Sequence, residues 1–118
     1  MENNEILKTA LNALDSKKGR NLQVIKVGDL TILAHYFILA SGGSSTQVKA
    51  LADEVEHKLK EKGENPKRTE GYNGANWVVL DYIDVVIHIF HEETREFYDL
   101  ERLWQDGEFL SAGDFIES

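Results

Sequence analysis

Two apolar runs separated by only two residues constrain the fold of this chain more than any other feature. Residues 77–82 read WVVLDY and residues 85–90 read VVIHIF, with Ile83-Asp84 between them. Runs rich in β-branched and aromatic residues predict strands, and a two-residue connection predicts an antiparallel hairpin. A hairpin alone is barely stable in water, so the rest of the chain must extend this sheet and cover it.

Alternation along the hairpin separates its side chains into two faces. One face is almost wholly apolar and is expected to pack beneath helices. The other combines Trp77 and Phe90 with Asp81 and His88, a mixture typical of protein interfaces. A structural role, with Trp77 against a loop and Asp81 paired with His88, fits equally well. Because Ile83 is ill suited to a positive φ, a wider turn would exchange the two faces. The apolar face comprises Val78, Leu80, Tyr82, Val85, Ile87, Ile89 and His91, and the mixed face comprises Trp77, Val79, Asp81, Val86, His88 and Phe90.

Two amphipathic segments predict the helices that cover the apolar face. Residues 5–18 carry apolar side chains at helical spacing, and Gly19 follows as a stop. Ser44 and Gln47 form a capping-box pattern at the start of a second helix, which ends at Gly63. The apolar stripes comprise Leu7, Ala10, Leu11 and Leu14 in the first helix, and Val48, Leu51, Ala52, Val55 and Leu59 in the second.

The order of elements predicts an α+β fold. Besides the hairpin, strands are expected over 22–27, 35–40 and 66–71, and a final helix, whole or in two pieces, over 91–104. The order α-β-β-α-β-β-β-α indicates a two-layer sandwich with a mixed five-stranded sheet. Residues 1–105 are expected to form one domain, and residues 106–118, which lack a pattern, a mobile tail.

The final helix combines aromatic and acidic residues. Phe97, Leu100 and Trp104 can share one helical face, which is expected to dock on the core. Tyr98 would then be exposed together with the acidic residues Glu96, Asp99 and Glu101. Such a surface suits a basic partner.

Composition narrows the classes of function. The 118 residues include 21 acidic and 13 basic side chains, a net charge of −8, which disfavours direct nucleic-acid contact and favours a basic protein partner. The absence of cysteine excludes disulfides, thiol catalysis and cysteine metal sites. No apolar run approaches the ~20 residues that cross a bilayer, and no signal peptide is evident, so no membrane contact and a cytoplasmic location are expected.

The stretch Gly42-Gly43-Ser44-Ser45 raises the question of phosphate binding. A glycine-rich turn at a helix N-terminus can hold a phosphate, but this one lacks the lysine of a P-loop. Asp81 and Asp84 are three residues apart, so on a strand they point to opposite faces and cannot share a magnesium ion. We therefore expect no cofactor, no metal and no catalysis, with a nucleotide-binding or nucleotidyltransferase enzyme that uses the 42–45 turn as the alternative.

Three stretches carry a resemblance to a known family: ALDSKKG (13–19), YFILASGGSSTQVKALADEV (36–55) and NWVVLDYIDVVIHIFHEETREFYDLERLW (76–104). The chain resembles the ribosomal silencing factors, the Iojap-like family, over residues 5–105. It departs from the family pattern at His35, where aspartate is usual, in the glycine loop, where Gly-Thr-Ser-Ser is usual, and at Ile83, where glycine is usual.

The resemblance implies both a fold and a function. The fold would be nucleotidyltransferase-like without the catalytic carboxylates. The function would be that of a translation repressor that binds ribosomal protein fourteen of the large subunit and blocks the joining of the small subunit. The same mixed face also suits pairing of two copies into a homodimer when no ribosome is present. The residues expected to bind the partner are Trp77, Asp81, His88, His91, Glu92 and Tyr98.

Overall fold

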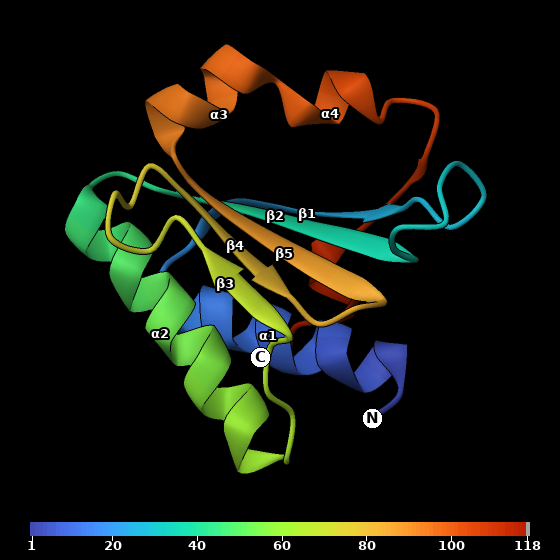
Figure 1. Ribbon diagram of the computed structural model, residues 1–118, viewed down its shortest axis with the longest axis horizontal. Coiled ribbons are helices and arrows are strands. Elements are labelled where there is room, and N and C mark those ends of the chain that lie inside the picture. The colour runs from blue at the N-terminus through green and yellow to red at the C-terminus, as the bar shows by residue number, and fades with distance from the viewer. Residues whose placement is uncertain (118) are drawn as a thin grey trace.

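A six-stranded mixed sheet forms the centre of the computed structural model, which describes residues 1–117. The strands lie in the order β3-β4-β5-β2-β1-β6, with β2 and β5 parallel and every other pair antiparallel. Helices lie on both sides of this sheet (Figure 1). The α+β class is confirmed, whereas the five-stranded sheet is wrong by one strand. The elements are α1 (Asn3–Ser16), β1 (Arg20–Lys26), β2 (Tyr36–Gly42), α2 (Ser45–Glu61), β3 (Arg68–Glu70), β4 (Trp77–Asp81), β5 (Val85–His91), α3 (Glu92–Tyr98), α4 (Leu100–Leu103), β6 (Glu108–Leu110) and the 3₁₀ helix η1 (Ala112–Asp114).

The helices α1 and α2 cover one face of the sheet. Their predicted apolar stripes are buried without exception, and they pack on the inward side chains of β4 and β5. Ser44 caps α2 as its position predicted, since its Oγ accepts a hydrogen bond from the Gln47 amide at 3.1 Å. This layer contains the main core and holds the hairpin from one side.

The predicted register of the β4–β5 hairpin is confirmed. Trp77 lies opposite Phe90, and the Tyr82 amide donates to the Val85 carbonyl at 2.9 Å, which leaves Ile83 and Asp84 as the turn. The Asp84 amide also donates to the Tyr82 carbonyl at 3.0 Å, and Ile83 has a φ of 74°. The turn is therefore a tight γ-turn in which a β-branched residue is held in a strained conformation.

Replacing Ile83 by glycine is expected to stabilise the protein. The Ile83→Gly variant should gain about 1 kcal/mol in free energy of unfolding, because glycine adopts a positive φ without steric strain. Urea denaturation followed by circular dichroism measures the change. Ile83→Val keeps the β-branched strain and should show no gain, whereas an Ile83→Gly variant no more stable than wild type would contradict this account.

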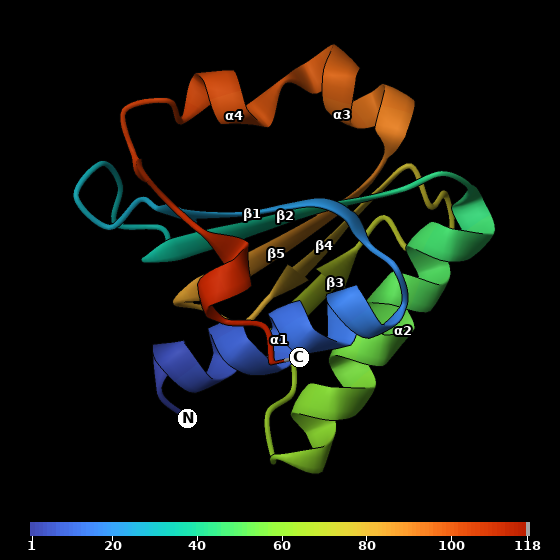
Figure 2. The ribbon, with the colours of Figure 1, turned by 180° about the vertical axis from the view of Figure 1, so that it is seen from behind.

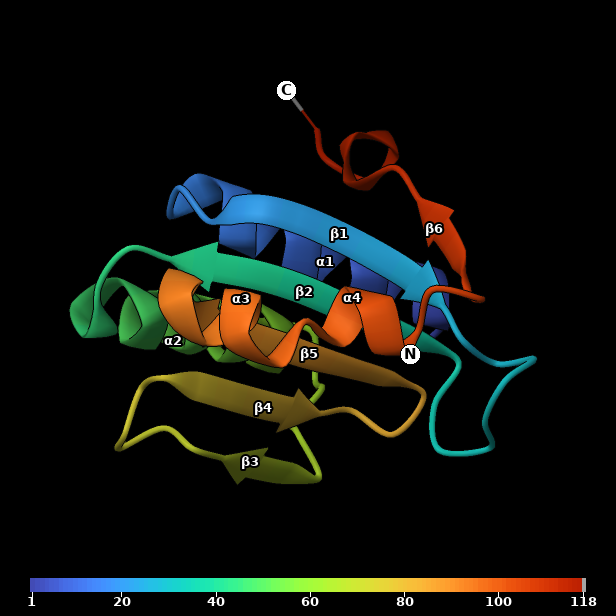
Figure 3. The ribbon, with the colours of Figure 1, turned by 90° about the horizontal axis from the view of Figure 1, so that it is seen from above.

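The second face of the sheet is covered as well, which corrects the two-layer prediction. The helices α3 and α4 lie over the central strands β2 and β5, and β3 and β4 extend beyond them (Figure 3). A second core lies beneath this cover, with Phe90 fully buried and Leu100 only 8% exposed. Its buried members are Ile25, Val27, Ala34, Phe37, Leu39, Phe90 and Leu100, with Trp77, Val86 and Trp104 packed against it.

The segment predicted as a mobile tail is built into the fold. Residues 108–110 form β6, which pairs antiparallel with the outer edge of β1. The following residues run beside α1 (Figure 2), where Asn12 donates to the Phe115 carbonyl at 3.0 Å and accepts from the Glu117 amide at 2.9 Å. Residues 106–117 thus contain a strand and a 3₁₀ helix where the sequence showed no pattern, while the mobility of this tail stays a prediction. Ser118 lies outside the described residues.

The predicted final helix is broken in two at Asp99. This residue has a φ of 46° and a ψ of 57°, in the left-handed region, and it separates α3 from α4. The break lies between Phe97, which is 81% exposed, and Leu100, which is 8% exposed. The prediction that Phe97 docks on the core is therefore wrong, because Phe97 and Leu100 do not share one helical face.

Candidate partner-binding site

Trp77 is the centre of an aromatic cluster on the second face of the sheet. Its ring stacks on Phe90 at a centroid distance of 4.9 Å and lies 5.1 Å from the ring of Tyr98 on α3. Its Nε1 donates a hydrogen bond to Nδ1 of His88 at 3.1 Å. Trp77 is partly buried, so one part of the indole supports the second core while another reaches the surface beside Tyr98.

His88 lies beneath the cover and is 8% exposed. It was expected on the mixed face in contact with a partner; here it packs against Phe37 and Phe90, and its Nδ1 holds the Trp77 indole by a hydrogen bond. Because Nδ1 accepts the indole N–H, Nε2 carries the proton, and that atom is buried without a hydrogen-bond partner among the described residues. The ring meets Phe37 edge to face at 5.1 Å. Burial lowers the pKa of His88 to about 4, so the ring is neutral at neutral pH.

The expected pairing of Asp81 with His88 is wrong. Asp81 instead accepts from the Ile83 amide at 2.8 Å, which fixes the hairpin turn, and pairs with Arg68 of β3 at 3.4 Å. It therefore lies at the end of the hairpin away from Trp77. The carboxylate of Asp81 is thus engaged within the protein. A protein bound at Trp77 would have to reach along the whole of β4 to contact Asp81.

His91 and Glu92 lie at the other end of the hairpin, next to Trp77. His91 caps α3, since its Nδ1 accepts from the Glu93 amide at 3.3 Å, and its own amide donates to the Asn76 carbonyl at 2.8 Å. Glu92 forms an ion pair with Arg20 of β1. Of the six predicted residues, Trp77 contacts both His88 and Tyr98. His91 and Glu92 lie at the start of α3, and Asp81 lies apart.

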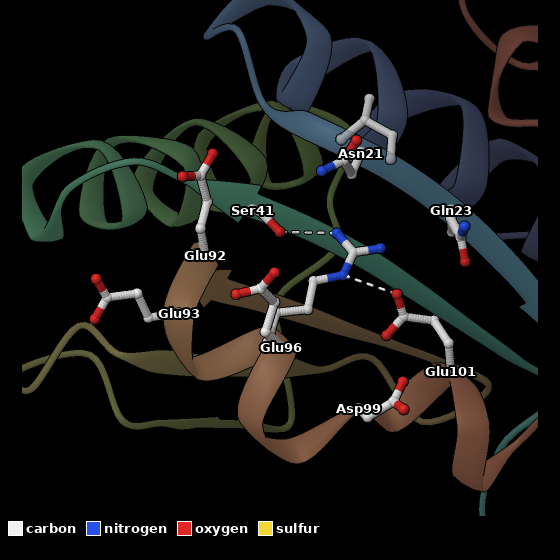
Figure 4. A pocket seen from close by; sticks show the side chains of 10 residues that line it. Asn21, Gln23, Ser41, Glu92, Glu93, Glu96, Asp99 and Glu101 are labelled. Atoms are coloured by element: carbon white, nitrogen blue, oxygen red, sulfur yellow. Dashed lines mark hydrogen bonds and ion pairs between the residues drawn. The ribbon is translucent and has the colours of Figure 1, made fainter.

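Sequence reasoning missed a buried arginine on α3. Arg95 is 7% exposed; its Nη1 donates to the Ser41 hydroxyl at 2.8 Å and its Nε to Glu101 at 3.1 Å. These groups line a pocket of about 770 Å³. Dashed lines in Figure 4 mark the two hydrogen bonds. The pattern of an arginine among acidic helix residues predicts solvent exposure, so no local signal indicated that Arg95 is buried. The lining residues are Asn21, Leu22, Gln23, Ser41, Glu92, Glu93, Arg95, Glu96, Asp99 and Glu101.

Sequence reasoning also missed the exposed apolar side chains of the cover. Phe97 is 81% exposed and Leu103 is 72% exposed, with Tyr98 between them at 55%. Glu96, Asp99 and Arg102 line the same surface pocket as these three residues. We call Phe97, Tyr98 and Leu103 the apolar ridge. Apolar side chains rimmed by acidic ones are typical of a surface that binds a basic protein.

The glycine-serine turn is held by hydrogen bonds to Gln47. Oε1 of Gln47 accepts from the Gly43 amide at 2.7 Å, and Nε2 of Gln47 donates to the Lys18 carbonyl at 3.0 Å. A Cβ on Gly43 would lie 3.0 Å from Nη1 of Arg20, so the arginine closes over the turn. With the Ser44 cap, this arrangement accounts for the turn as a helix start that joins α2 to the end of α1.

Removing the Ser44 cap is expected to destabilise α2. The Ser44→Ala variant should lose about 1 kcal/mol of unfolding free energy, because the Gln47 amide loses its acceptor. Urea denaturation measures the loss, and Ser45→Ala, at an exposed position of the first helical turn, is the matched control. Equal stability of the two variants would show that the cap contributes nothing.

Residues 1–117 contain neither a cluster of metal-ligating side chains nor a membrane-spanning helix. No group of three or more histidine, aspartate or glutamate side chains in this range is placed to hold a metal ion. No helix in the same range is long and apolar enough to cross a membrane.

Comparison with known proteins shows the family of this chain. The family described as ribosomal silencing factor during starvation matches residues 1–117. The chain belongs to the ribosomal silencing factor family. A ribosomal silencing factor from Halalkalibacterium halodurans is 41% identical over 106 residues, covering 90% of this chain and 91% of the relative. A crystal structure from Chromobacterium violaceum superposes with a TM-score of 0.86 at 41% identity, over 94% of this chain and 92% of the other.

A more distant relative carries a longer chain. A mouse protein named mitochondrial assembly of ribosomal large subunit protein 1 is 30% identical over 97 residues, which cover 80% of this chain and 42% of the relative. The resemblance noted in the sequence is thus confirmed. The ribosomal silencing factor fold described above is common to this chain and to the solved structure.

Proposed function

We propose that this ribosomal silencing factor represses translation by binding ribosomal protein fourteen of the large ribosomal subunit and sterically blocking the joining of the small subunit. Family membership supports a ribosome-directed role. The printed name of the mouse relative, which refers to the large subunit, supports the choice of subunit. The mechanism requires occupancy of a surface rather than chemistry, and it would operate in the cytoplasm, where the subunits meet.

The surface of α3 and α4 is the observation that carries this proposal. It presents the apolar ridge and the outer part of Trp77, with Glu96, Asp99 and Arg102 beside the ridge. Glu92 and Glu93 lie in the first turn of α3. Aromatic anchors within a rim of charge are the arrangement in which few residues supply most of the binding energy. Because ribosomal proteins that contact RNA are basic, an acidic rim complements such a partner and speeds its encounter.

The partner-binding residues follow from this arrangement. Trp77 and Tyr98 would supply buried aromatic contact, while Glu92 and His91 would supply polar contact at the start of α3. His88 would act through Trp77, whose indole it orients. Asp81 would contribute only where the partner reaches the hairpin turn.

Binding to isolated subunits tests the proposal. Fluorescence anisotropy of the labelled protein is expected to rise with purified large subunits and to stay unchanged with small subunits. The association rate should fall as salt is added, because the attraction between opposite charges is screened. Equal binding to both subunits, or none to either, would contradict the proposal.

The same ridge offers a surface for a second copy of the chain, and we propose a homodimer of the free protein. Exposed apolar side chains as large as Phe97 and Leu103 are costly to leave in water. If the dimer uses this ridge, large subunits should dissociate it. Analytical ultracentrifugation with and without large subunits measures this, and an intact dimer on the subunit would show that the two surfaces are distinct.

A further inference from the structure

The rotation of α3 about its own axis places a charged residue inward and an aromatic residue outward. Arg95 is the only buried residue of α3, whereas Phe97 is 81% exposed. Residues two apart on an α-helix are separated by about 200° of rotation about the helix axis, so their side chains point to nearly opposite sides. Burying Arg95 therefore forces Phe97 to the outside, although the hydrophobic effect alone favours the opposite arrangement.

Hydrogen bonds of Arg95 hold α3 in this rotation. Nη1 donates to Ser41, which lies on β2 and is 1% exposed, and Nε donates to Glu101 on α4. A single guanidinium thus joins the sheet, α3 and α4. The helical backbone does not fix the angle between α3 and α4, because the left-handed residue Asp99 interrupts it between Arg95 and Glu101.

An ion pair of this kind is weak evidence for stability. Replacing buried charged pairs by apolar residues is often neutral or stabilising, since two charges no longer have to leave water. The pair of Arg95 and Glu101 can instead determine which of two packings on the sheet α3 adopts. Without Arg95, α3 could roll so that Phe97 packs toward the sheet and adds to the second core.

We propose that Arg95 is a positioning residue that holds Phe97 at the surface for partner binding. It fixes the rotation of α3 through Ser41 and the angle between α3 and α4 through Glu101. The part of this inference that concerns binding rests on the proposed function. The part that concerns the rotation of α3 does not, and it is measured on the isolated protein.

Fluorine NMR of protein labelled with para-fluorophenylalanine tests the rotation. The chain has five phenylalanines, so the spectrum is simple, and the Phe97 signal is assigned by its loss in Phe97→Tyr. The shift between water and deuterated water reports solvent exposure of each ring. The test variant is Arg95→Met with Glu101→Gln, which removes both charges together, and the control is Arg102→Met, which removes an exposed arginine of α4.

The Phe97 ring is expected to be solvent-exposed in wild type and in Arg102→Met and to lose that exposure in the double variant. If the double variant does not fold, Arg95→Lys is measured instead, since lysine keeps the charge but cannot reach Ser41 and Glu101 with the same fork of donors. A folded variant that lacks the two hydrogen bonds and keeps Phe97 exposed would overturn the proposal.

Affinity for purified large subunits supplies the second measurement. The double variant is expected to bind roughly tenfold more weakly than wild type, and Phe97→Ser should add little to that loss. Fully additive losses would show that Arg95 acts independently of Phe97 and would overturn its positioning role. If wild type itself fails to bind large subunits, the proposed function fails, while the NMR result still decides the role of Arg95 in orienting α3.

Discussion

Acidification from about pH 7 to about pH 4 is expected to lower the free energy of unfolding by about 3 kcal/mol through His88 alone. Burial lowers the pKa of His88 from 6.5 to about 4 in the folded protein. Between these values the unfolded chain binds a proton that the folded chain excludes, so stability is highest above the unfolded pKa and falls as the pH decreases toward the folded one. Protonation would also put a hydrogen on Nδ1 of His88, which could then no longer accept the hydrogen bond from Nε1 of Trp77.

Urea denaturation at a series of pH values measures this effect. Carboxylates also titrate in this range, so the informative quantity is the difference between wild type and His88→Gln, whose amide oxygen can still accept from Trp77. His57→Gln removes an exposed histidine of α2 and should keep the wild-type pH dependence. If His88→Gln loses stability on acidification as steeply as wild type, His88 does not carry the effect.

Truncation of Trp77 is expected to give the largest loss of binding. Trp77→Ala should weaken affinity for the large subunit by about 2 kcal/mol, roughly 30-fold, because a central aromatic anchor contributes far more than rim residues. Trp77→Phe keeps the stack on Phe90 but loses the hydrogen bond to His88, so it should show a smaller loss. Titration of labelled protein with large subunits measures both.

Stability has to be measured beside affinity, because Trp77 also packs against the second core. Part of any loss in Trp77→Ala comes from a less stable cover, and the affinity is therefore read at a temperature where circular dichroism shows the variant folded. A folded Trp77→Ala variant with wild-type affinity would remove this residue from the interface.

Features that depend on local periodicity were predictable from the sequence. The register of the hairpin followed from the two residues between its strands, and the start of α2 followed from Ser44 and Gln47. Every residue of the apolar stripes predicted for α1 and α2 lies in the main core. In each case a pattern within a few residues determines the structure, since turn geometry and helical spacing act over that distance.

Features that depend on contacts between residues far apart in the sequence were not predictable from it. β6 has three residues, and only its pairing with β1 makes it a strand. The burial of Arg95 depends on Ser41, 54 residues earlier in the chain. The division of the final helix into α3 and α4 depends on the left-handed conformation of Asp99, although no glycine lies near that position. The sequence left open whether the mixed face binds a partner or is structural, and it did not show that residues of α4 pack onto that face.

Sedimentation of the purified protein with ribosomal subunits tests the central claim most directly. Separated large and small subunits are mixed under conditions that favour joining, with and without the protein, and resolved on a sucrose gradient. We predict that the protein migrates with the large subunit and that the peak of joined ribosomes falls as the protein is added. An undiminished peak of joined ribosomes, with the protein absent from the large-subunit fraction, would contradict the account.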